Sequence, residues 1–247
     1  MKKVACFLLS IAFLGQFLFC CKEKPAPKTR PKVVKIIQTN IFTLKTKVLV
    51  IGDSHLCGFF GKHLEEALKK TKAFLDLHGV CGSSPAWWFN EKTTGCGYYH
   101  LGKTKLSVKT PKIVDLLSKE KPDVVLGANM LSGYDKPIFD ETKKLVLAVS
   151  KSKAKLYWIG PPLAEKRKNK LPDLCENLKK AIGNLGVFVD SRPYTPKYFG
   201  KDGIHFSGKK GDLASKMWAL GVFYEIQFNK EKALSLFNNF YPEELRK

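Results

Sequence analysis

The sequence predicts an α/β fold, a three-layer α/β/α sandwich built around a mainly parallel sheet of five strands. Three observations support this fold class. Short, β-branched apolar runs, which are typical of buried parallel strands, recur along the chain. Segments with apolar residues at helical spacing separate these runs, and strands that alternate with helices form a parallel sheet covered on both faces. The length of 247 residues is sufficient for one substantial domain of this kind.

The first 21 residues have the pattern of an export signal. Two lysines precede an apolar run over 4–19. The alternative interpretation is a transmembrane helix, but the run is short for one. The run ends at Cys20 and Cys21, and a cysteine at this junction resembles a bacterial lipoprotein signal, in which it becomes the acylated first residue. Cleavage before Cys21 is favoured, because the bulky Phe19 precedes Cys20. We therefore expect an exported protein of the bacterial cell envelope, periplasmic or at the surface, held at the membrane by a lipid anchor.

A tether and lead-in segment, residues 22–44, connects this signal to the domain. Its first part, 22–32, is rich in Lys and Pro and is expected to be extended and solvated. The part from 33 to 44 is either an additional strand or a strap along the domain. The domain proper covers residues 45–247.

Within the domain the apolar pattern predicts strands at 48–51, 73–80, 122–127, 155–160 and 187–190. Apolar residues at helical spacing predict a helix directly after Ser54 and further helices at 110–119, 137–150, 174–185, 208–228 and 231–240. A long loop follows the second strand, and such loops inside a domain are usually functional or disordered. Its aromatic side chains favour an ordered wall of a site, which could stack on sugar rings or pack onto the domain; they are Trp87, Trp88, Tyr98 and Tyr99.

Ser54 lies in a tight turn between the first strand and the helix that follows it. A hydroxyl at this position is exposed above the sheet edge, close to the backbone N–H groups of a helix start. Those groups favour negative charge, as the oxyanion formed in acyl transfer requires. The alternative is that Asp53 or Ser54 only caps the helix, since both residue types are preferred caps.

Further polar or small residues lie where other predicted strands end. Ligands of an open parallel sheet bind outside the carboxyl ends of its strands, and here Gly82 follows the second strand and Asn129 the third. Asp202 and His205 lie three residues apart, just before the long C-terminal helix, so both can face one site. A serine nucleophile needs a base, and a histidine base needs a partner that fixes its tautomer.

Four short segments resemble, in this order, the sequence blocks of the SGNH (GDSL-type) hydrolases. They are Gly52-Asp53-Ser54-His55, Gly82, Gly127-Ala128-Asn129 and Asp202-Gly203-Ile204-His205. The resemblance runs from about residue 47 to 206 and implies the flavodoxin-like fold of that family. One departure is His55, which stands where a leucine usually follows the serine.

The resemblance implies a serine esterase that needs no cofactor and no metal. Ser54 would be the nucleophile and His205 the general base, with Asp202 orienting His205. The backbone N–H groups of Ser54 and Gly82 and the side-chain amide of Asn129 would form the oxyanion hole. Because His55 only adjoins the serine in sequence, His205 is the favoured base.

The expected substrate is an acylated carbohydrate or a lipid ester. An envelope location and an aromatic loop favour O-acetyl groups on a cell-envelope or surface polysaccharide. A lipase or lysophospholipase is the enzymatic alternative and would need a wide apolar acyl groove. An inactive SGNH-fold module that binds glycan is the third reading, and the complete set of five site residues argues against it. We expect a monomer.

The formal net charge of +21 at pH 7 favours contact with anionic surfaces. It is spread along the chain, which favours a generally solvated basic surface over one specific anionic ligand. No zinc-finger, helix-turn-helix or RNA-binding signature is present, so nucleic acid is not an expected partner. Three further histidines show no metal-ligand spacing and are expected to be ordinary surface or loop residues; they are His63, His78 and His100.

The cysteines of the domain fall into two groups. Cys81 and Cys96 flank the aromatic loop, and in an exported protein a disulfide that closes this loop is expected. Cys57 and Cys175 either pair with each other or are buried thiols. A cysteine nucleophile is disfavoured, because neither has an evident base nearby in the sequence.

Overall fold

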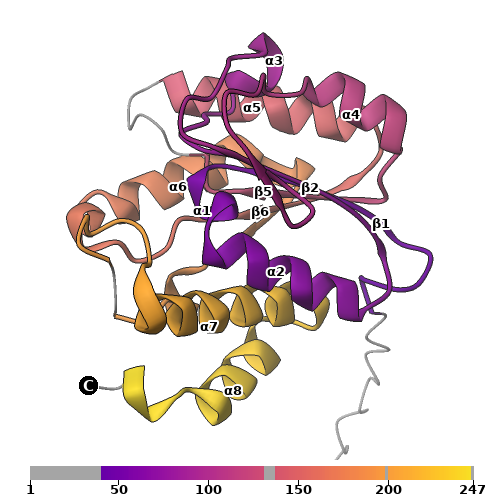
Figure 1. Ribbon diagram of the computed structural model, residues 1–247. Helices are drawn as coiled ribbons and strands as arrows, with labels where there is room; N and C mark the ends of the chain where they lie inside the picture. The colour runs from indigo at the N-terminus through magenta and orange to yellow at the C-terminus, as the bar shows by residue number, and fades with distance from the viewer. Residues whose placement is uncertain (1–39, 131–136, 198–199, 246–247) are drawn as a thin grey trace, which may run out of the picture. The chain divides into compact units, whose positions relative to one another are not determined.

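The computed structural model describes residues 40–130, 137–197 and 200–245, which surround one seven-stranded sheet (Figure 1). The strand order is β4-β3-β2-β1-β5-β6-β7. The strands are β1 (Lys47–Gly52), β2 (Phe74–Val80), β3 (Tyr98–His100), β4 (Lys103–Lys105), β5 (Val124–Ala128), β6 (Lys155–Ile159) and β7 (Val187–Val189). β1, β2, β5, β6 and β7 pair in parallel and confirm the five predicted strands. β3 and β4 are additional and antiparallel, at the edge beyond β2.

Helices cover both faces of this sheet, as the sandwich prediction requires (Figure 1). They are α1 (Ser54–Cys57), α2 (Phe59–Lys70), α3 (Trp87–Asn90), α4 (Ile113–Glu120), α5 (Pro137–Lys151), α6 (Leu171–Ile182), α7 (Gly208–Gln227) and α8 (Lys230–Phe240). Short 3₁₀ turns are η1 (Glu165–Arg167), η2 (Gly183–Leu185), η3 (Arg192–Tyr194) and η4 (Glu243–Leu245). α2, α7 and α8 lie on one face, and α3 to α6 lie on the other.

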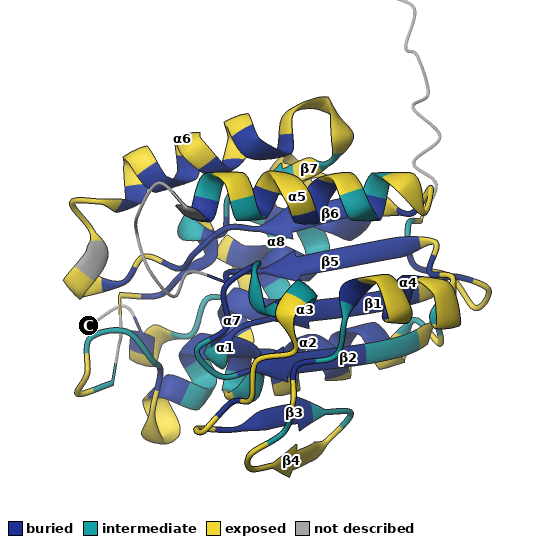
Figure 2. Ribbon diagram, turned by 90° about the horizontal axis from the view of Figure 1, so that it is seen from above, coloured by how far each residue is buried: buried dark blue, intermediate teal, exposed yellow. Residues whose placement is uncertain are grey.

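The two faces of the sheet bury separate apolar cores. In β1, Val48 and Val50 point into the core under α2 and α7, whereas Leu49 and Ile51 point into the core under α4 to α6. This alternation follows from the two-residue period of a strand, and a strand buried on both sides reads as a continuous apolar run. Figure 2 shows β1, β5 and β6 buried along most of their length, while the outer stripes of α4, α5 and α6 are exposed.

The sequence predicts the helices well, with shifts at their ends. α4 begins at Ile113 rather than near residue 110. α6 begins at Leu171 and ends at Ile182. Gly183, which follows it, has φ 56°, and a positive φ favours glycine.

Two glycines, Gly61 of α2 and Gly79 of β2, allow α1 to lie directly against α2 and against the carboxyl end of β2. A Cβ atom on Gly61 would lie 1.9 Å from the carbonyl oxygen of Leu56, and one on Gly79 would lie 2.8 Å from the Leu56 backbone carbon. Leu56 is fully buried between them. This close packing fixes the turn that carries Ser54.

The predicted export signal, the lipid-anchor candidates Cys20 and Cys21, and the tether to residue 39 lie outside the described residues. Phe42 is buried in the core beside α7, and its backbone N–H donates to the side-chain oxygen of Gln227 at 2.9 Å. The end of the lead-in segment therefore packs on the domain. Within the described part of the chain, no helix combines the length and the apolarity needed to cross a bilayer.

Candidate active site

The structure brings Ser54 and His205 into direct hydrogen-bond contact, although 150 residues separate them in the chain. The Ser54 hydroxyl oxygen lies 2.8 Å from Nε2 of His205. Ser54 is the first residue of α1, directly after the end of β1 and the cap residue Asp53. His205 comes from the loop before α7.

Asp202 organises the turn that carries His205. One carboxylate oxygen, Oδ1, accepts hydrogen bonds from the backbone N–H groups of Ile204 (2.9 Å) and His205 (2.8 Å). The other, Oδ2, lies 2.6 Å from Nδ1 of the His205 ring. An Asp that binds the backbone two and three residues ahead is a common turn device, so the Asp-x-x-His spacing builds this geometry locally.

These contacts also determine which nitrogen of His205 carries the proton. Partial desolvation raises the pKa of Asp202, but the hydrogen bonds from the His205 ring and from the two backbone N–H groups outweigh it. The pKa of Asp202 therefore lies well below its ordinary value. An ionised carboxylate only accepts hydrogen bonds, so Nδ1 of His205 is the donor and Nε2 is left to accept from the Ser54 hydroxyl.

Candidate donors for an oxyanion lie at the ends of three neighbouring strands. The N–H groups of Ser54 and Gly82 donate to no acceptor in the described residues. Gly82 has φ 75°, a left-handed conformation that favours glycine. Asn129 is 1% exposed, and neither its amide nitrogen nor its amide oxygen has a hydrogen-bond partner among the described residues.

The ring of His55 packs against that of His205. Its ring centroid lies 5.1 Å from that of His205 and 5.2 Å from that of Trp218, whose plane it meets edge-on. Trp218 is fully buried and stacks on Phe60 at 3.8 Å. A continuous series of ring contacts, through His55, Trp218 and Phe60, therefore connects His205 to the buried core.

The loop after β2 is closed by a disulfide between Cys81 and Cys96, whose Cα atoms are 5.7 Å apart, and this confirms the predicted pairing. Thr94 donates its hydroxyl hydrogen across the closed loop to the carbonyl oxygens of Cys81 (3.1 Å) and Gly97 (3.3 Å). The bridge adjoins Gly82, so it constrains one of the candidate oxyanion donors.

The aromatic residues of this loop do not form the sugar-stacking wall that the sequence suggested. Trp88 is fully buried in the core, Tyr98 is 9% exposed, and Tyr99 donates its hydroxyl hydrogen to the buried Glu65 carboxylate at 2.5 Å. Only Trp87 is half-buried, with the ammonium of Lys92 at 5.7 Å from its ring. The apolar area of these rings is used for packing, which is the other alternative the sequence left open.

The two remaining thiols of the domain are free, so the possible pairing of Cys57 with Cys175 is wrong. Burial, with the charge of Asp53 as a smaller contribution, raises the pKa of Cys57 to about 12. Burial raises that of Cys175 to about 11. Thiols with such pKa values carry little thiolate at neutral pH, which agrees with a serine nucleophile.

A cavity of about 360 Å³ lies between the start of α2, the β3–β4 hairpin and the residue after His205. Its lining residues are Cys57, Gly58, Phe59, Lys62, Tyr99, Gly102 and Phe206. Ser54, Asp202 and His205 are not among them.

Two histidines that the sequence suggested to be ordinary residues lie together. His78 and His100 both contact the carboxylate of Asp76. The sequence indicates that Asp76 and His78 share one side of a strand, because they are alternate residues. It does not indicate that His100 is their neighbour, because β3 falls within the predicted loop. His63 lies elsewhere, between Glu66 and Asp212.

Neither a protein-family model nor a curated protein matches this sequence. Among solved structures, the chain is similar to TesA, with 15% identity, a TM-score of 0.45, and coverage of 72% of this chain and 98% of that chain. It is also similar to a GDSL-like lipase from Bacteroides thetaiotaomicron, with 11% identity, a TM-score of 0.37, and coverage of 78% and 88%. A third is an AraC family transcriptional regulator from Pseudomonas putida, with 8% identity, a TM-score of 0.34, and coverage of 79% and 100%.

Proposed function

We propose that the protein is a serine ester hydrolase of the SGNH type that acts through Ser54, His205 and Asp202. The observation that supports this most is the continuous hydrogen-bonded series from the Ser54 hydroxyl through both nitrogens of His205 to Asp202, at 2.8 Å and 2.6 Å. A helix cap would need the Ser54 hydroxyl to accept from a backbone N–H of α1, whereas Asp53 accepts that bond from His55.

In the first half-reaction, Nε2 of His205 takes the hydroxyl proton as Ser54 Oγ attacks the ester carbonyl. Asp202 stabilises the imidazolium that forms. When the tetrahedral intermediate collapses, the carbon–oxygen bond to the alcohol breaks, and His205 returns the proton to the leaving alkoxide. In the second half-reaction, His205 removes a proton from water as the water oxygen attacks the carbonyl carbon of the acyl-serine. The bond from that carbon to Ser54 Oγ then breaks and His205 returns the proton to Oγ, which releases the acid and regenerates Ser54.

The negative charge of the tetrahedral intermediate needs donors that are in place before the reaction. The N–H groups of Ser54 and Gly82 and the side-chain amide of Asn129 are available for this role, since none of them donates elsewhere in the described residues. A buried amide without a partner is costly, and an oxyanion would supply the missing acceptor.

We propose O-acetyl groups on a cell-envelope or surface polysaccharide as the substrate, with the enzyme exported and lipid-anchored through Cys21 or Cys20. The support is the sequence pattern of the first 21 residues and the strongly basic composition, +21, which suits anionic envelope polymers. The apolar rings around the 360 Å³ cavity, Phe59, Tyr99 and Phe206, favour the alternative of a longer acyl chain.

The test is hydrolysis of p-nitrophenyl esters from acetate to laurate by the full chain in mild detergent and by its Ser54→Ala variant. Ser152→Ala is the matched control, because this serine caps the end of α5 through a hydrogen bond to Val149 at 2.7 Å, away from the triad. Acetate turnover that is lost in Ser54→Ala and retained in Ser152→Ala supports the esterase.

Rates that rise with chain length would replace the O-acetyl substrate by a lipid ester. If the unchanged chain and Ser54→Ala gave equal rates on every ester, the esterase proposal would fail. The inactive glycan-binding module would then be the better explanation, and binding of acetylated and de-acetylated polysaccharide would be compared.

A further inference from the structure

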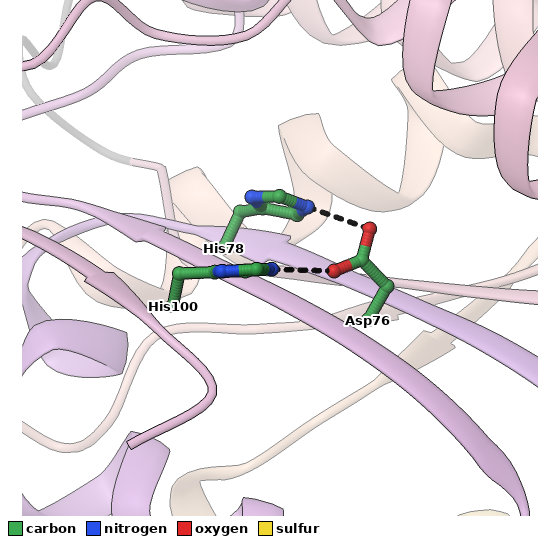
Figure 3. Close-up of side chains that lie close together, drawn as sticks. All are labelled: Asp76, His78 and His100. Atoms are coloured by element: carbon green, nitrogen blue, oxygen red, sulfur yellow. Dashed lines mark hydrogen bonds and ion pairs between the residues drawn. The ribbon is translucent and has the colours of Figure 1, made fainter. Parts of the chain in front are cut away.

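Three metal-ligating side chains meet on one face of the sheet, away from the serine–histidine pair. Asp76 and His78 are alternate residues of β2, so their side chains leave the strand on the same side. His100 lies on β3, directly opposite His78 in the antiparallel register. Figure 3 shows both imidazole rings directed at the one carboxylate of Asp76.

The donor atoms converge on a common point. Nε2 of His78 lies 2.8 Å from Oδ2 of Asp76, and Nε2 of His100 lies 2.7 Å from Oδ1. The two rings are stacked, with centroids 4.6 Å apart and an angle of 20° between their planes. One donor atom from each residue lies within 4.8 Å of the others. Tetrahedral zinc, with bonds of about 2.0–2.2 Å, needs donor atoms about 3.3 Å apart, so a small opening of the hydrogen bonds is sufficient.

Burial of the three side chains suits a metal that enters from solvent. The His78 side chain is 7% exposed and that of Asp76 is 18% exposed, whereas His100 is 40% exposed. Two ligands are therefore held by the protein interior, and the His100 side remains open for entry and for a water ligand.

The second nitrogen of His78 already has a partner that orients the ring. Nδ1 lies 2.5 Å from the hydroxyl oxygen of Tyr98, two residues before His100 on β3. When Nε2 binds a metal, the ring proton must reside on Nδ1, and the Tyr98 oxygen can accept a hydrogen bond from it. Ligating histidines almost always have such an outer partner, which fixes the tautomer and the ring.

The charge of Asp76 is offset only in part. No Lys or Arg of the described chain forms an ion pair with it, and its polar partners are the two imidazoles. The charge of Lys119, which pairs with Glu120 at 2.6 Å, also interacts with that of Asp76. A half-buried carboxylate beside two imidazoles is a donor set with the charge that a divalent cation complements.

We propose that Asp76, His78 and His100 bind one divalent transition-metal ion, for which zinc is the best fit. Two imidazole nitrogens and one carboxylate oxygen suit zinc and its neighbours better than magnesium or calcium, which prefer all-oxygen sites. The ion would join β2 to the short edge strand β3 and thereby hold the β3–β4 hairpin on the sheet. This role is independent of the proposed esterase.

The experiment is calorimetric titration of the metal-stripped full chain with Zn²⁺, and absorption spectroscopy with Co²⁺ as the substitute ion. We expect His100→Gln and Asp76→Asn each to weaken a zinc site by more than about 100-fold, and Tyr98→Phe to weaken it by about 10–100-fold. His63→Gln is the matched control. This histidine also lies between two carboxylates, at 3.3 Å and 2.9 Å, but through opposite ring nitrogens that do not converge.

His100→Gln is the decisive variant, because its exposed ring can be replaced without opening the core; circular dichroism would verify the fold. Zinc affinity that is unchanged in His100→Gln, or absent from the unchanged chain, would overturn the proposal. A thiolate-to-cobalt charge-transfer band would do the same, since it would assign the metal to cysteines. Zinc affinity is read without any ester, so this result and that of the esterase test are distinguishable.

Discussion

Asn129 buries a whole amide group that has no hydrogen-bond partner among the described residues. Leaving a buried polar group unpaired costs about 1–3 kcal/mol, and an apolar side chain would fold more favourably there. Its backbone is also left-handed, with φ 59°, and so is that of Met130, with φ 56°. Such conformations are uncommon outside glycine and gather at functional sites, and a role in binding the oxyanion accounts for both features.

The variant Asn129→Gly tests this role without adding strain, because glycine accepts a left-handed backbone. We expect kcat for p-nitrophenyl acetate to fall by about 10²–10³, the usual effect of losing one oxyanion donor. Thr142→Val is the matched control, since the Thr142 hydroxyl is equally buried and unpaired but lies on α5. A kcat that falls equally in both variants, or in neither, would remove Asn129 from the oxyanion hole.

The lowered pKa of Asp202 leads to a prediction about how stability and activity depend on pH. Its pKa is lowered by the hydrogen bonds from His205 and Ile204, which outweigh its desolvation, so the carboxylate stays ionised from neutral to mildly acid pH. A lowered pKa stabilises the ionised, folded turn above the ordinary Asp value, and this stabilisation is lost only as the pH falls through the lowered pKa.

Asp202 should therefore contribute no proton to the acid limb of kcat/KM, and the slope of that limb should not exceed one. Asp202→Asn should reduce kcat by about 10³–10⁴, because the amide no longer selects the productive tautomer. A pH-rate measurement from mildly acid to neutral solution checks both statements. An acid limb with a slope of two would show that a second group, such as Asp202 itself, titrates in this range.

At the scale of the elements, the sequence predicts what depends on long periodic patterns. The five parallel strands carry continuous apolar runs, and the helices between them carry amphipathic spacing. β3 and β4 are only three residues each, which is too short for a periodic signal, and the sequence places the two tyrosines of β3 in a loop. Because β3 was not predicted, its pairing with β2 was not predicted either. The sequence therefore did not indicate that His78 and His100 lie opposite each other.

The candidate active site was easier to predict than the cluster of Asp76, His78 and His100, for a physical reason. Ser54, Gly82 and Asn129 each follow a predictable strand, and carboxyl ends of parallel strands meet at one edge. Local hydrogen bonds of the Asp202 carboxylate stabilise the turn from Asp202 to His205. The burial of Trp88, Tyr98 and Tyr99 could not be predicted from the sequence, because an aromatic side chain suits a core as well as a binding surface.

The disulfide-closed loop after β2 gives a prediction about this element. Replacing Cys81 and Cys96 together by Ala should lower the free energy of unfolding by about 2–4 kcal/mol, because the bridge restricts the unfolded chain. It should also reduce kcat, since Gly82 follows Cys81 directly. Urea unfolding and ester hydrolysis measure the two effects.

Reduction of the unchanged chain with dithiothreitol serves as the control and should reproduce both losses. The double variant should not respond to the reductant, although the free thiols Cys57 and Cys175 are still present. A double variant as stable and as active as the unchanged chain would show that hydrogen bonds of Thr94 alone are sufficient to hold the loop.

At the scale of the whole molecule, the sheet gathers residues from distant parts of the chain. β1 is the middle strand of the seven-stranded sheet, with β2 on one side and β5 on the other. Their three carboxyl ends therefore supply Ser54, Gly82 and Asn129 side by side, and the loop before α7 adds Asp202 and His205. Beside the amino ends of β5 and β6, away from these residues, a groove of about 890 Å³ between α4 and α5 has Lys121, Lys144, Lys151, Lys153 and Asp123 in its lining.

The net charge of +21 predicts how the proposed esterase activity responds to salt. A strongly cationic protein attracts an anionic polymer over roughly one Debye length, which falls from about 30 Å at 0.01 M to about 3 Å at 1 M salt. We expect kcat/KM for an O-acetylated acidic polysaccharide to fall by roughly tenfold or more over this range. For the neutral p-nitrophenyl acetate, kcat/KM should change less than about twofold, because the triad chemistry does not depend on long-range attraction. Equal salt responses of the two substrates would show that the positive charge plays no part in substrate capture, and a neutral glycan or a lipid ester would then be the better substrate class.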